Sequence, residues 1–261
     1  MSAALAARME HIARDVAAEW HLALGPRIAA GRYSYVAPAG DDAILKVVPP
    51  EDDSADQQID ALLFWNADGA VRVLRHDRER RVLLLERVIP GTDAATASED
   101  DAIGAAVAAG RRIWRSPPRA HPFRTAADWV RRWLPSDDAH PLVPLARRTF
   151  EGIQPRSDAL LHADLHHHNI LRRDDEWVVI DPKPVVGAPE FDIPAFLWNP
   201  LGTPSTRART ERRIRAFTDS GLDGELIRAW AIVRGVCDGL PLRAGQRDED
   251  RPQLRVVREL L

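Results

Sequence analysis

The stretch His162-Ala163-Asp164-Leu165-His166-His167-His168-Asn169 places an aspartate and an asparagine five residues apart in a polar loop. The apolar pair Leu160-Leu161 precedes this loop, and a second aspartate, Asp181, ends the predicted strand Trp177–Ile180 twelve residues after Asn169. Carboxylate and amide oxygens are hard ligands of the kind that Mg²⁺ prefers in proteins. The spacing therefore predicts a catalytic loop followed by a metal-binding aspartate.

Lysine is rare in this chain. Of the 36 basic residues only Lys46 and Lys183 are lysines; Lys46 lies in the predicted strand Ala43–Val48, and Lys183 follows Asp181 by two residues. A lysine retained where arginine is otherwise used indicates that a compact ammonium group is needed at that place. The alternative for Lys46 is an ordinary solvent-exposed residue of a strand.

These groups together are typical of phosphoryl transfer from ATP. A strand lysine neutralises the α- and β-phosphates, and a loop aspartate accepts or orients the proton of the attacking hydroxyl. An asparagine and a second aspartate hold Mg²⁺. The segment Glu86-Arg87-Val88, between the two halves of the chain, is the fourth feature of this set.

The first third of the chain predicts an antiparallel sheet. Residues 2–24 carry apolar side chains at a period close to 3.6 and predict a helix that Ser2 caps and Gly25-Pro26 ends. Four strands are then expected at residues 33–36, 43–48, 70–74 and 82–86, with a short helix around residues 59–66. We place the boundary between two lobes at Pro90-Gly91.

The rest of the chain is predicted to be mainly helical, with helices near residues 98–114, 125–134, 141–152, 189–198, 205–219, 223–237 and 248–260. The expected fold class is therefore α+β in two lobes. Residues 1–90 would form a small nucleotide-binding lobe with an extra N-terminal helix. Residues 91–261 would form a larger lobe with the catalytic loop and the substrate site.

Composition narrows the class of protein. The chain has 261 residues, a formal net charge of −3 at pH 7 and one cysteine, Cys237, which excludes an intrachain disulfide and a cysteine-based zinc site. The charge argues against a nucleic-acid partner held by bulk electrostatics. No apolar run approaches the ~20 residues of a membrane span, and charged residues between Arg8 and Asp15 interrupt any signal-peptide core. We expect a cytoplasmic protein with no membrane partner, as a monomer or a dimer.

The segment His162–Leu171 resembles the motif H-G-D-L-H-H-G-N-I-L of the aminoglycoside phosphotransferase family, in its streptomycin 6-kinase and hydroxyurea kinase branch. Ile180–Pro184 matches the branch motif I-D-P-K-P, and Trp198–Pro200 matches W-N-P. The resemblance runs from about residue 31 to residue 200, with weaker matches to Cys237. It implies a protein-kinase-like fold and ATP- and Mg²⁺-dependent phosphorylation of a hydroxyl group on a small molecule. The acceptor it favours is aminoglycoside-like, of the streptomycin type, and can be cationic.

The resemblance also implies roles for the residues that match it. Asp164 would be the catalytic base, His162 would order the catalytic loop, and Lys183 would assist catalysis. Asn169 and Asp181 would bind Mg²⁺.

The remaining candidates serve the nucleotide and the acceptor. Lys46 would contact the phosphates and the backbone of Glu86–Val88 would bind adenine, with Ser34 and Gln58 as further nucleotide contacts. Asp192 would brace the catalytic loop and lie near the acceptor, as would Trp198 and Asn199.

The chain departs from the family pattern at three places. Ala163 and His168 replace two glycines of the catalytic loop. The loop expected to cover the nucleotide, Gly31–Val36, is not glycine-rich. The helix acid that should pair with Lys46 is absent, because family spacing points to the uncharged Gln58; Asp56 and Asp60 are alternatives.

Other interpretations of the same residues stay open at this point. His162, Asp164, His166 and His168 could bind zinc directly. The same phosphoryl transfer could serve hydroxyurea, an amino alcohol or a sugar. The chain could also be a nucleotide-binding module with little catalysis, since the helix acid and the two glycines are replaced.

Overall fold

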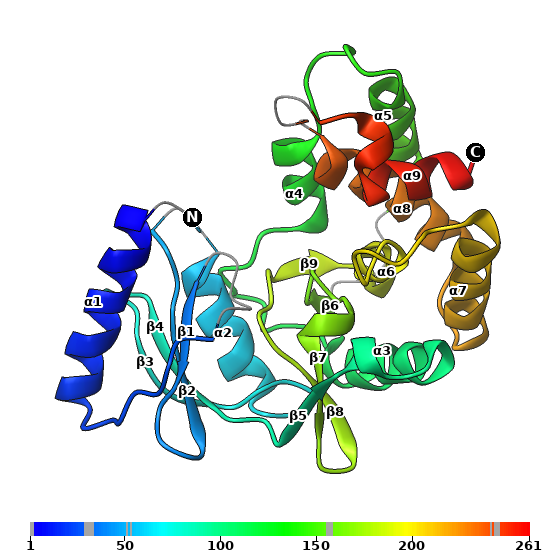
Figure 1. Cartoon of the computed structure of the whole chain (residues 1–261). Coiled ribbons are helices and arrows are strands. Elements are labelled where there is room, and N and C mark those ends of the chain that lie inside the picture. The colour runs from blue at the N-terminus through cyan, green and yellow to red at the C-terminus, as the bar shows by residue number, and fades with distance from the viewer. Residues whose placement is uncertain are drawn as a thin grey trace. The chain divides into compact units, whose positions relative to one another are not determined.

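The computed structural model (Figure 1) describes residues 3–28, 34–50, 52, 54–154, 159–240, 242 and 246–261. The chain forms two compact units. The first unit comprises Met1–Thr92 and Leu171–Lys183, and the second comprises Asp93–Ile170 and Pro184–Leu261. The segment that carries Asp181 and Lys183 therefore folds with the N-terminal sheet, although it lies late in the sequence.

A four-stranded antiparallel sheet forms the centre of the first unit. Its strands are β1 (Tyr35–Pro38), β2 (Ala43–Val47), β3 (Val73–Asp77) and β4 (Val82–Glu86), in the order β1-β2-β4-β3. In the register of β2 against β4, Lys46 lies opposite Leu83. The expected antiparallel pairing is confirmed.

Helices α1 (Ala3–Glu19) and α2 (Ala55–Trp65) lie on opposite faces of this sheet (Figure 1). On one face, α1 and β2 share a buried apolar cluster that includes Met9, Val16, Leu45 and Val47. Successive side chains of a strand point to opposite faces. Lys46, between Leu45 and Val47, therefore points away from α1 and meets Gln58 of α2.

A second, three-stranded sheet contains β5 (Pro90–Asp93), β7 (Ile170–Arg173) and β8 (Glu176–Val179), in the order β5-β7-β8. The end of β8 also pairs with the chain ahead of β3. The Val179 amide donates to the Gly69 carbonyl, and the Val71 amide donates to the Val179 carbonyl, each at 2.9 Å. The predicted strand at 70–74 was therefore placed too early: residues 70 and 71 pair with Val179, and β3 begins at Val73.

The predicted N-terminal helix was too long. It ends at Glu19, because His21 adopts a positive φ of 57° that a right-handed helix cannot include. Leu24, expected inside the helix, instead forms an isolated β-bridge with Ala39. The expected cap, Ser2, lies outside the described residues.

The second unit is mainly helical. Its seven predicted helices occur, but the one near 189–198 and the one near 248–260 each divide into a 3₁₀ turn and an α-helix. Proline stands at the start of both α-helices, where its missing N–H is harmless. The elements are η1 (Ala94–Thr96), α3 (Glu99–Ile113), α4 (Ala126–Trp133), α5 (Leu142–Gly152), β6 (Ala159–Leu161), η2 (His167–Asn169), β9 (Val185–Gly187), η3 (Pro189–Phe191), α6 (Ile193–Leu197), α7 (Arg207–Asp219), α8 (Gly224–Gly239), η4 (Asp248–Asp250) and α9 (Pro252–Glu259).

Helix α8 is the centre of this unit and packs against α4, α5, α6, α7 and α9. Two glycines allow α9 to approach closely. A Cβ atom at Gly235 would lie 2.4 Å from the Val257 side chain, and one at Gly239 would lie 2.6 Å from Leu254. Larger residues at these positions would push the two helices apart.

Arg213 of α7 is the most highly connected buried charge in the described part of the second unit. Its side chain is 1% exposed, and Nη1 donates to the carbonyls of Phe196, Leu197 and Asn199 at 2.6, 2.9 and 2.6 Å. These carbonyls lie at the end of the short helix α6 and just beyond it, where helical hydrogen bonds run out; the Phe196 carbonyl also accepts the Asn199 amide at 3.3 Å. Glu99 of α3 balances the charge through hydrogen bonds from Arg213 Nε and Nη2.

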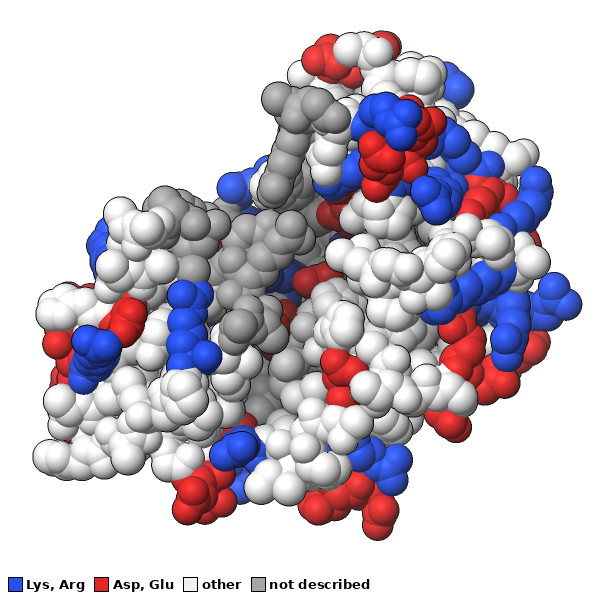
Figure 2. Space-filling view, in the orientation of Figure 1, with Lys and Arg blue, Asp and Glu red and all other residues white. Residues whose placement is uncertain are grey.

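A neighbouring pair on the same two helices is exposed. Arg212 and Asp100 lie 2.6 Å apart, with 56% and 76% of their side chains exposed. Basic and acidic side chains accordingly lie next to one another on the surface of the second unit (Figure 2).

Replacing Arg213 with methionine should destabilise the chain by about 3 kcal/mol, because three carbonyls lose their donor and Glu99 keeps only Arg209 as its basic partner. The matched change Arg212→Met should lower the free energy of unfolding by less than about 1 kcal/mol, since exposed ion pairs contribute little. Urea unfolding of both variants measures the difference. Equal losses would contradict the role given to Arg213.

The same pair predicts a loss of stability in acid. Burial alone would raise the pKa of Glu99, but hydrogen bonds from Arg213 and Arg209 outweigh it and lower this pKa from 4.5 to about 2. Its contribution is therefore complete above pH 4.5 and is lost as the pH falls towards 2. Between pH 6 and pH 3 we expect the free energy of unfolding to fall by about 2 kcal/mol more in the wild type than in Glu99→Gln. Parallel slopes for the two proteins would show that Glu99 does not titrate in this way.

Candidate active site

Three side chains of the first unit meet around Lys46. Its Nζ lies 2.6 Å from Asp181 Oδ1 and donates to Gln58 Oε1 at 2.9 Å. Gln58 Nε2 donates in turn to Asp181 Oδ1 at 2.9 Å and to the Pro182 carbonyl at 3.0 Å. We call Lys46, Gln58 and Asp181 the lysine triad.

The partner of Lys46 on α2 is thus Gln58. The alternatives, Asp56 and Asp60, contact Arg78 instead, at 4.0 and 2.5 Å. No helix acid contacts Lys46 among the described residues, so its anionic partner there is Asp181.

Asp181 is held as a carboxylate. Burial would raise its pKa, but the positive charges of Lys46 and Lys183 and the hydrogen bond from Gln58 outweigh this effect and hold the pKa well below its usual range. Its backbone has a φ of 56°, a left-handed conformation that few residues other than glycine adopt. Lys46 and Gln58 both reach Oδ1, and 42% of the side chain is exposed.

Lys183 lies beside the triad but forms its own ion pair. Its Nζ lies 2.5 Å from Asp52 Oδ2, and Asp52 Oδ1 also accepts the Ser54 amide at 3.0 Å. Ser54 precedes α2, so this pair fastens the start of α2 to the segment that follows Asp181. Lys183 therefore forms an ion pair with Asp52, a residue of the same unit.

The adenine candidates occupy the end of β4. The Glu86 carboxylate accepts a hydrogen bond from the Arg72 amide at 3.0 Å and contacts Arg173 at 2.6 Å. Its side chain therefore stabilises the first unit. Val88 follows β4 and is half-buried. Gly91, at φ 73°, turns the chain so tightly that a Cβ atom would lie 2.7 Å from the Val88 carbonyl oxygen.

Ser34 is buried at the start of β1, and its carbonyl accepts Arg27 Nη2 at 3.5 Å. Gly31, Arg32 and Tyr33, the first half of the loop expected to cover the nucleotide, lie outside the described residues.

The second unit contains the loop His162–Asn169, which the sequence predicts to be the catalytic loop and for which we keep that name. The Asn169 amide nitrogen donates to the Asp164 carbonyl at 2.9 Å, and the Asp164 amide donates to His162 Nδ1 at 3.2 Å. These contacts close the loop on itself. His162 and Asn169 are buried, whereas 40% of the Asp164 side chain is exposed.

His166 borders Asp164 in this loop. Its Nδ1 accepts the His168 amide at 3.2 Å, and its Nε2 lies 3.8 Å from Asp164 Oδ2. His168 Nδ1 contacts Asp93 Oδ2 at 2.7 Å. The described residues contain no group of three or more histidine, cysteine or acidic side chains that could hold a metal ion, so the interpretation of these histidines as a zinc site is not supported.

Asp192 fixes the start of the loop. Its carboxylate accepts the His162 amide at 3.0 Å, the Ala163 amide at 2.5 Å and Trp114 Nε1 at 2.8 Å. Complete burial raises the pKa of Asp192, although each of these donors opposes the rise. Ala163, which replaces a family glycine, has a φ of 60°, so the carboxylate holds a backbone turn that alanine adopts reluctantly.

The end of the loop is fixed from the other end of α6. The His167 ring stacks on Phe196 at 3.8 Å between centroids, and Arg213 Nη2 lies 3.4 Å from His167 Nε2. Burial, with the charge of Arg213, lowers the pKa of His167 to about 3, so this histidine is neutral at pH 7.

Trp198 and Asn199, predicted to contact substrate, are both buried. The Asn199 amide nitrogen donates to the Ala195 carbonyl at 2.8 Å, and its own carbonyl accepts Arg213. The contacts of Asn199 thus close the end of α6.

One acidic residue near the catalytic loop was missed. Asp238 of α8 contacts Arg234 Nη2 at 3.1 Å, and 28% of its side chain is exposed. Burial raises the pKa of Asp238; the charge of Asp164 adds to the rise, while Arg234 opposes it. The charge of Asp164 is thus one of the influences on the pKa of Asp238. The sequence signal for Asp238 is Arg234, four residues before it, and such pairs are too common on helices to single out a site.

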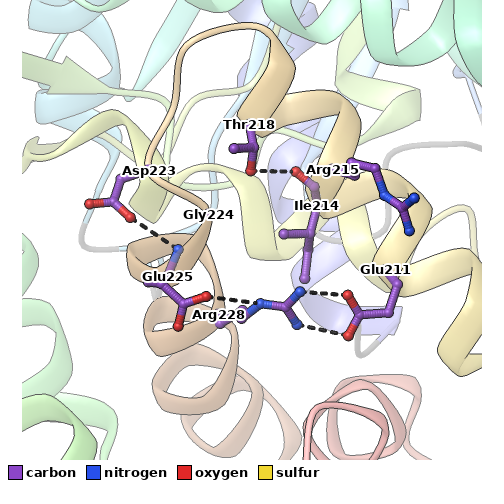
Figure 3. Close-up of a pocket in the computed structure, with 8 residues that line it drawn as sticks. All are labelled: Glu211, Ile214, Arg215, Thr218, Asp223, Gly224, Glu225 and Arg228. Atoms are coloured by element: carbon purple, nitrogen blue, oxygen red, sulfur yellow. Dashed lines mark hydrogen bonds and ion pairs between the residues drawn. The ribbon is translucent and has the colours of Figure 1, made fainter.

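A hollow of about 390 Å³ between α7 and α8 lies apart from these residues. Figure 3 shows Arg228 between Glu211 and Glu225, at 2.5 and 3.6 Å. The positive charge of Arg228 is thus neutralised by two acids that line the same hollow. Nothing in its lining indicates a ligand.

Comparisons with known proteins show the family of the chain. The model of the aminoglycoside/hydroxyurea antibiotic resistance kinase family matches residues 19–244. The chain belongs to this family. The streptomycin 6-kinase of Streptomyces griseus is 30% identical over 236 residues, which cover 82% of this chain and 76% of that enzyme.

Solved structures confirm the protein-kinase-like fold. The choline kinase LicA from Streptococcus pneumoniae superimposes with a TM-score of 0.67 at 13% identity, covering 96% of this chain and 98% of that one. An aminoglycoside phosphotransferase in complex with ADP and hygromycin B gives a TM-score of 0.61 at 16% identity, covering 95% and 98%. As a member of the resistance kinase family, the chain is an ATP-dependent phosphotransferase that acts on small molecules. No helix in the described ranges has the length and apolar character needed to cross a membrane.

Proposed function

We propose that this kinase transfers the γ-phosphate of ATP, with Mg²⁺, to a hydroxyl group of a cationic, aminoglycoside-like acceptor of the streptomycin type. The observation that carries the proposal is the partly exposed carboxylate of Asp164 on a loop whose backbone His162 and Asn169 hold. Asp238 of α8 adds a second carboxylate to the second unit, and the charge of Asp164 contributes to its raised pKa. The family match and the streptomycin 6-kinase relative support the same acceptor class.

In this proposal Asp164 accepts the proton of the acceptor hydroxyl. The hydroxyl oxygen bonds to the γ-phosphorus as the bond from that phosphorus to the ADP oxygen breaks. The exposed fraction of the Asp164 side chain leaves it accessible to a substrate, while His162, Asp192 and Asn169 hold its backbone. Trp198 and Asn199 would shape the acceptor side from the end of α6.

The first unit would hold the nucleotide. Lys46 would contact the phosphates, Lys183 would add positive charge beside them, and Ser34 and the backbone of Glu86–Val88 would face the adenosine. In this proposal residues 1–90, joined by Leu171–Lys183, supply the nucleotide-binding lobe, and the rest of residues 91–261 supplies the catalytic loop and the acceptor site.

The donor atoms fit Mg²⁺. Asp181 is an exposed, ionised carboxylate, and Asn169 uses its amide nitrogen on the Asp164 carbonyl, which leaves its amide oxygen as a hard ligand. When bound, Mg²⁺ would neutralise phosphate charge as the γ-phosphoryl group moves. Asp181 and Asn169 are the protein ligands that we propose for it.

Transfer of labelled γ-phosphate from ATP to streptomycin tests the reaction directly. Replacing Asp164 with asparagine should lower kcat by about 10²–10⁴, because the variant cannot accept the proton. Wild-type-like turnover of this variant would remove Asp164 from the mechanism. Transfer to hydroxyurea, an amino alcohol or a sugar, but not to streptomycin, would assign another acceptor. ATP binding without transfer to any of them would indicate a weakly catalytic nucleotide-binding module.

The negative charge of Asp238 leads us to expect that the acceptor site prefers a cation. The Asp238→Asn variant should raise KM for a cationic acceptor about tenfold and leave KM for ATP unchanged, since one charge of attraction is lost at a partly buried site. Glu225→Gln, on the same helix and 91% exposed at its side chain, is the control. An unaltered acceptor KM in Asp238→Asn would place the cation elsewhere.

A further inference from the structure

Gln58 uses every polar atom of its side chain. The residue is 2% exposed. Its Oε1 accepts one hydrogen bond from Lys46, and its Nε2 donates one to Asp181 and one to the Pro182 carbonyl. The amide therefore joins an ammonium group on one side to two acceptors on the other.

This set of partners fixes the chemistry needed at position 58. With the amide reversed, its N–H groups would face the Lys46 ammonium and its oxygen would face two acceptors. A glutamate would satisfy Lys46 with one oxygen, but its second oxygen would face Asp181 Oδ1 and the Pro182 carbonyl, which are 2.9 and 3.0 Å from the present nitrogen. Only a neutral amide meets all three partners at pH 7.

The neutral amide also sets the charge of the lysine triad. Lys46 brings one positive charge and Asp181 one negative charge, so the three side chains are neutral together. A carboxylate at position 58 would make them negative by one. It would also give Lys46 a second anionic partner in a buried site, where charges interact strongly.

We propose that Gln58 is a positioning residue that holds Lys46 and Asp181 together without adding negative charge, and so keeps Lys46 available to the phosphates of a nucleotide. Gln58 is thus a required bridge in this chain, and introducing the acid that the family resemblance leads one to expect impairs the site. The inference rests on the proposed function in one respect, that the anionic ligand is ATP.

The test is the Kd of ATP with Mg²⁺, measured by titration calorimetry without any acceptor. In Gln58→Glu we expect Kd to rise about tenfold, because the new carboxylate competes with phosphate for Lys46 and repels Asp181. The matched control is Gln57→Glu, the same change one residue away on α2, in which Kd should stay within about twofold of the wild type. With an acceptor present, KM for ATP should follow Kd.

A second variant removes the bridge without adding charge. In Gln58→Met, which keeps the size of the side chain, we expect Kd to rise by about threefold, because Lys46 and Asp181 lose their common partner. This variant decides the matter if thermal unfolding shows that Gln58→Glu does not fold.

The inference is overturned if Gln58→Glu folds and binds ATP as tightly as the wild type, or if Gln57→Glu weakens binding equally. It is also overturned if Gln58→Met binds as the wild type does. Failure of the proposed function looks different, because the wild type itself would then bind no ATP.

Discussion

The catalytic loop depends on the carboxylate of Asp192. Three donors converge on this buried group, two of them the backbone amides of His162 and Ala163. At the opposite end of α6, Arg213 collects three carbonyls and Phe196 stacks on His167. The loop is therefore held at both ends of the five-residue helix α6, by Asp192 before it and by Phe196 near its end. This explains how the Asp164 side chain can be partly exposed while its backbone is fixed.

In the first unit, the main constraint is the burial of a lysine, Lys46. Lys46 is 6% exposed on a strand whose neighbouring side chains face an apolar cluster. An ammonium group is tolerated there because Asp181 neutralises it and Gln58 supplies a further acceptor. The Lys183–Asp52 pair fastens α2 beside these groups. Both lysines of the chain therefore form ion pairs with aspartates of the first unit, Lys46 with Asp181 and Lys183 with Asp52.

Local patterns in the sequence predicted much of the fold. The helix predicted near residues 98–114 occurs as α3, and the antiparallel pairing expected for the first sheet is correct. The errors occurred where partners distant in sequence decided the backbone. Residues 70 and 71 pair with Val179, and Leu24 pairs with Ala39. A sequence window holds no information about such partners.

The sequence by itself determined the family, the chemistry and most of the residues that the proposal uses, because reactive groups must keep their spacing along a loop. Only the tertiary structure decided their partners. It gave Lys46 an amide in place of an acid, turned Asp56 and Asp60 towards Arg78, and paired Lys46 with Asp181. The physical reason is that hydrogen bonds and charges act over a few ångströms in space, and the fold brings together residues as far apart in the chain as Lys46 and Asp181, 135 positions.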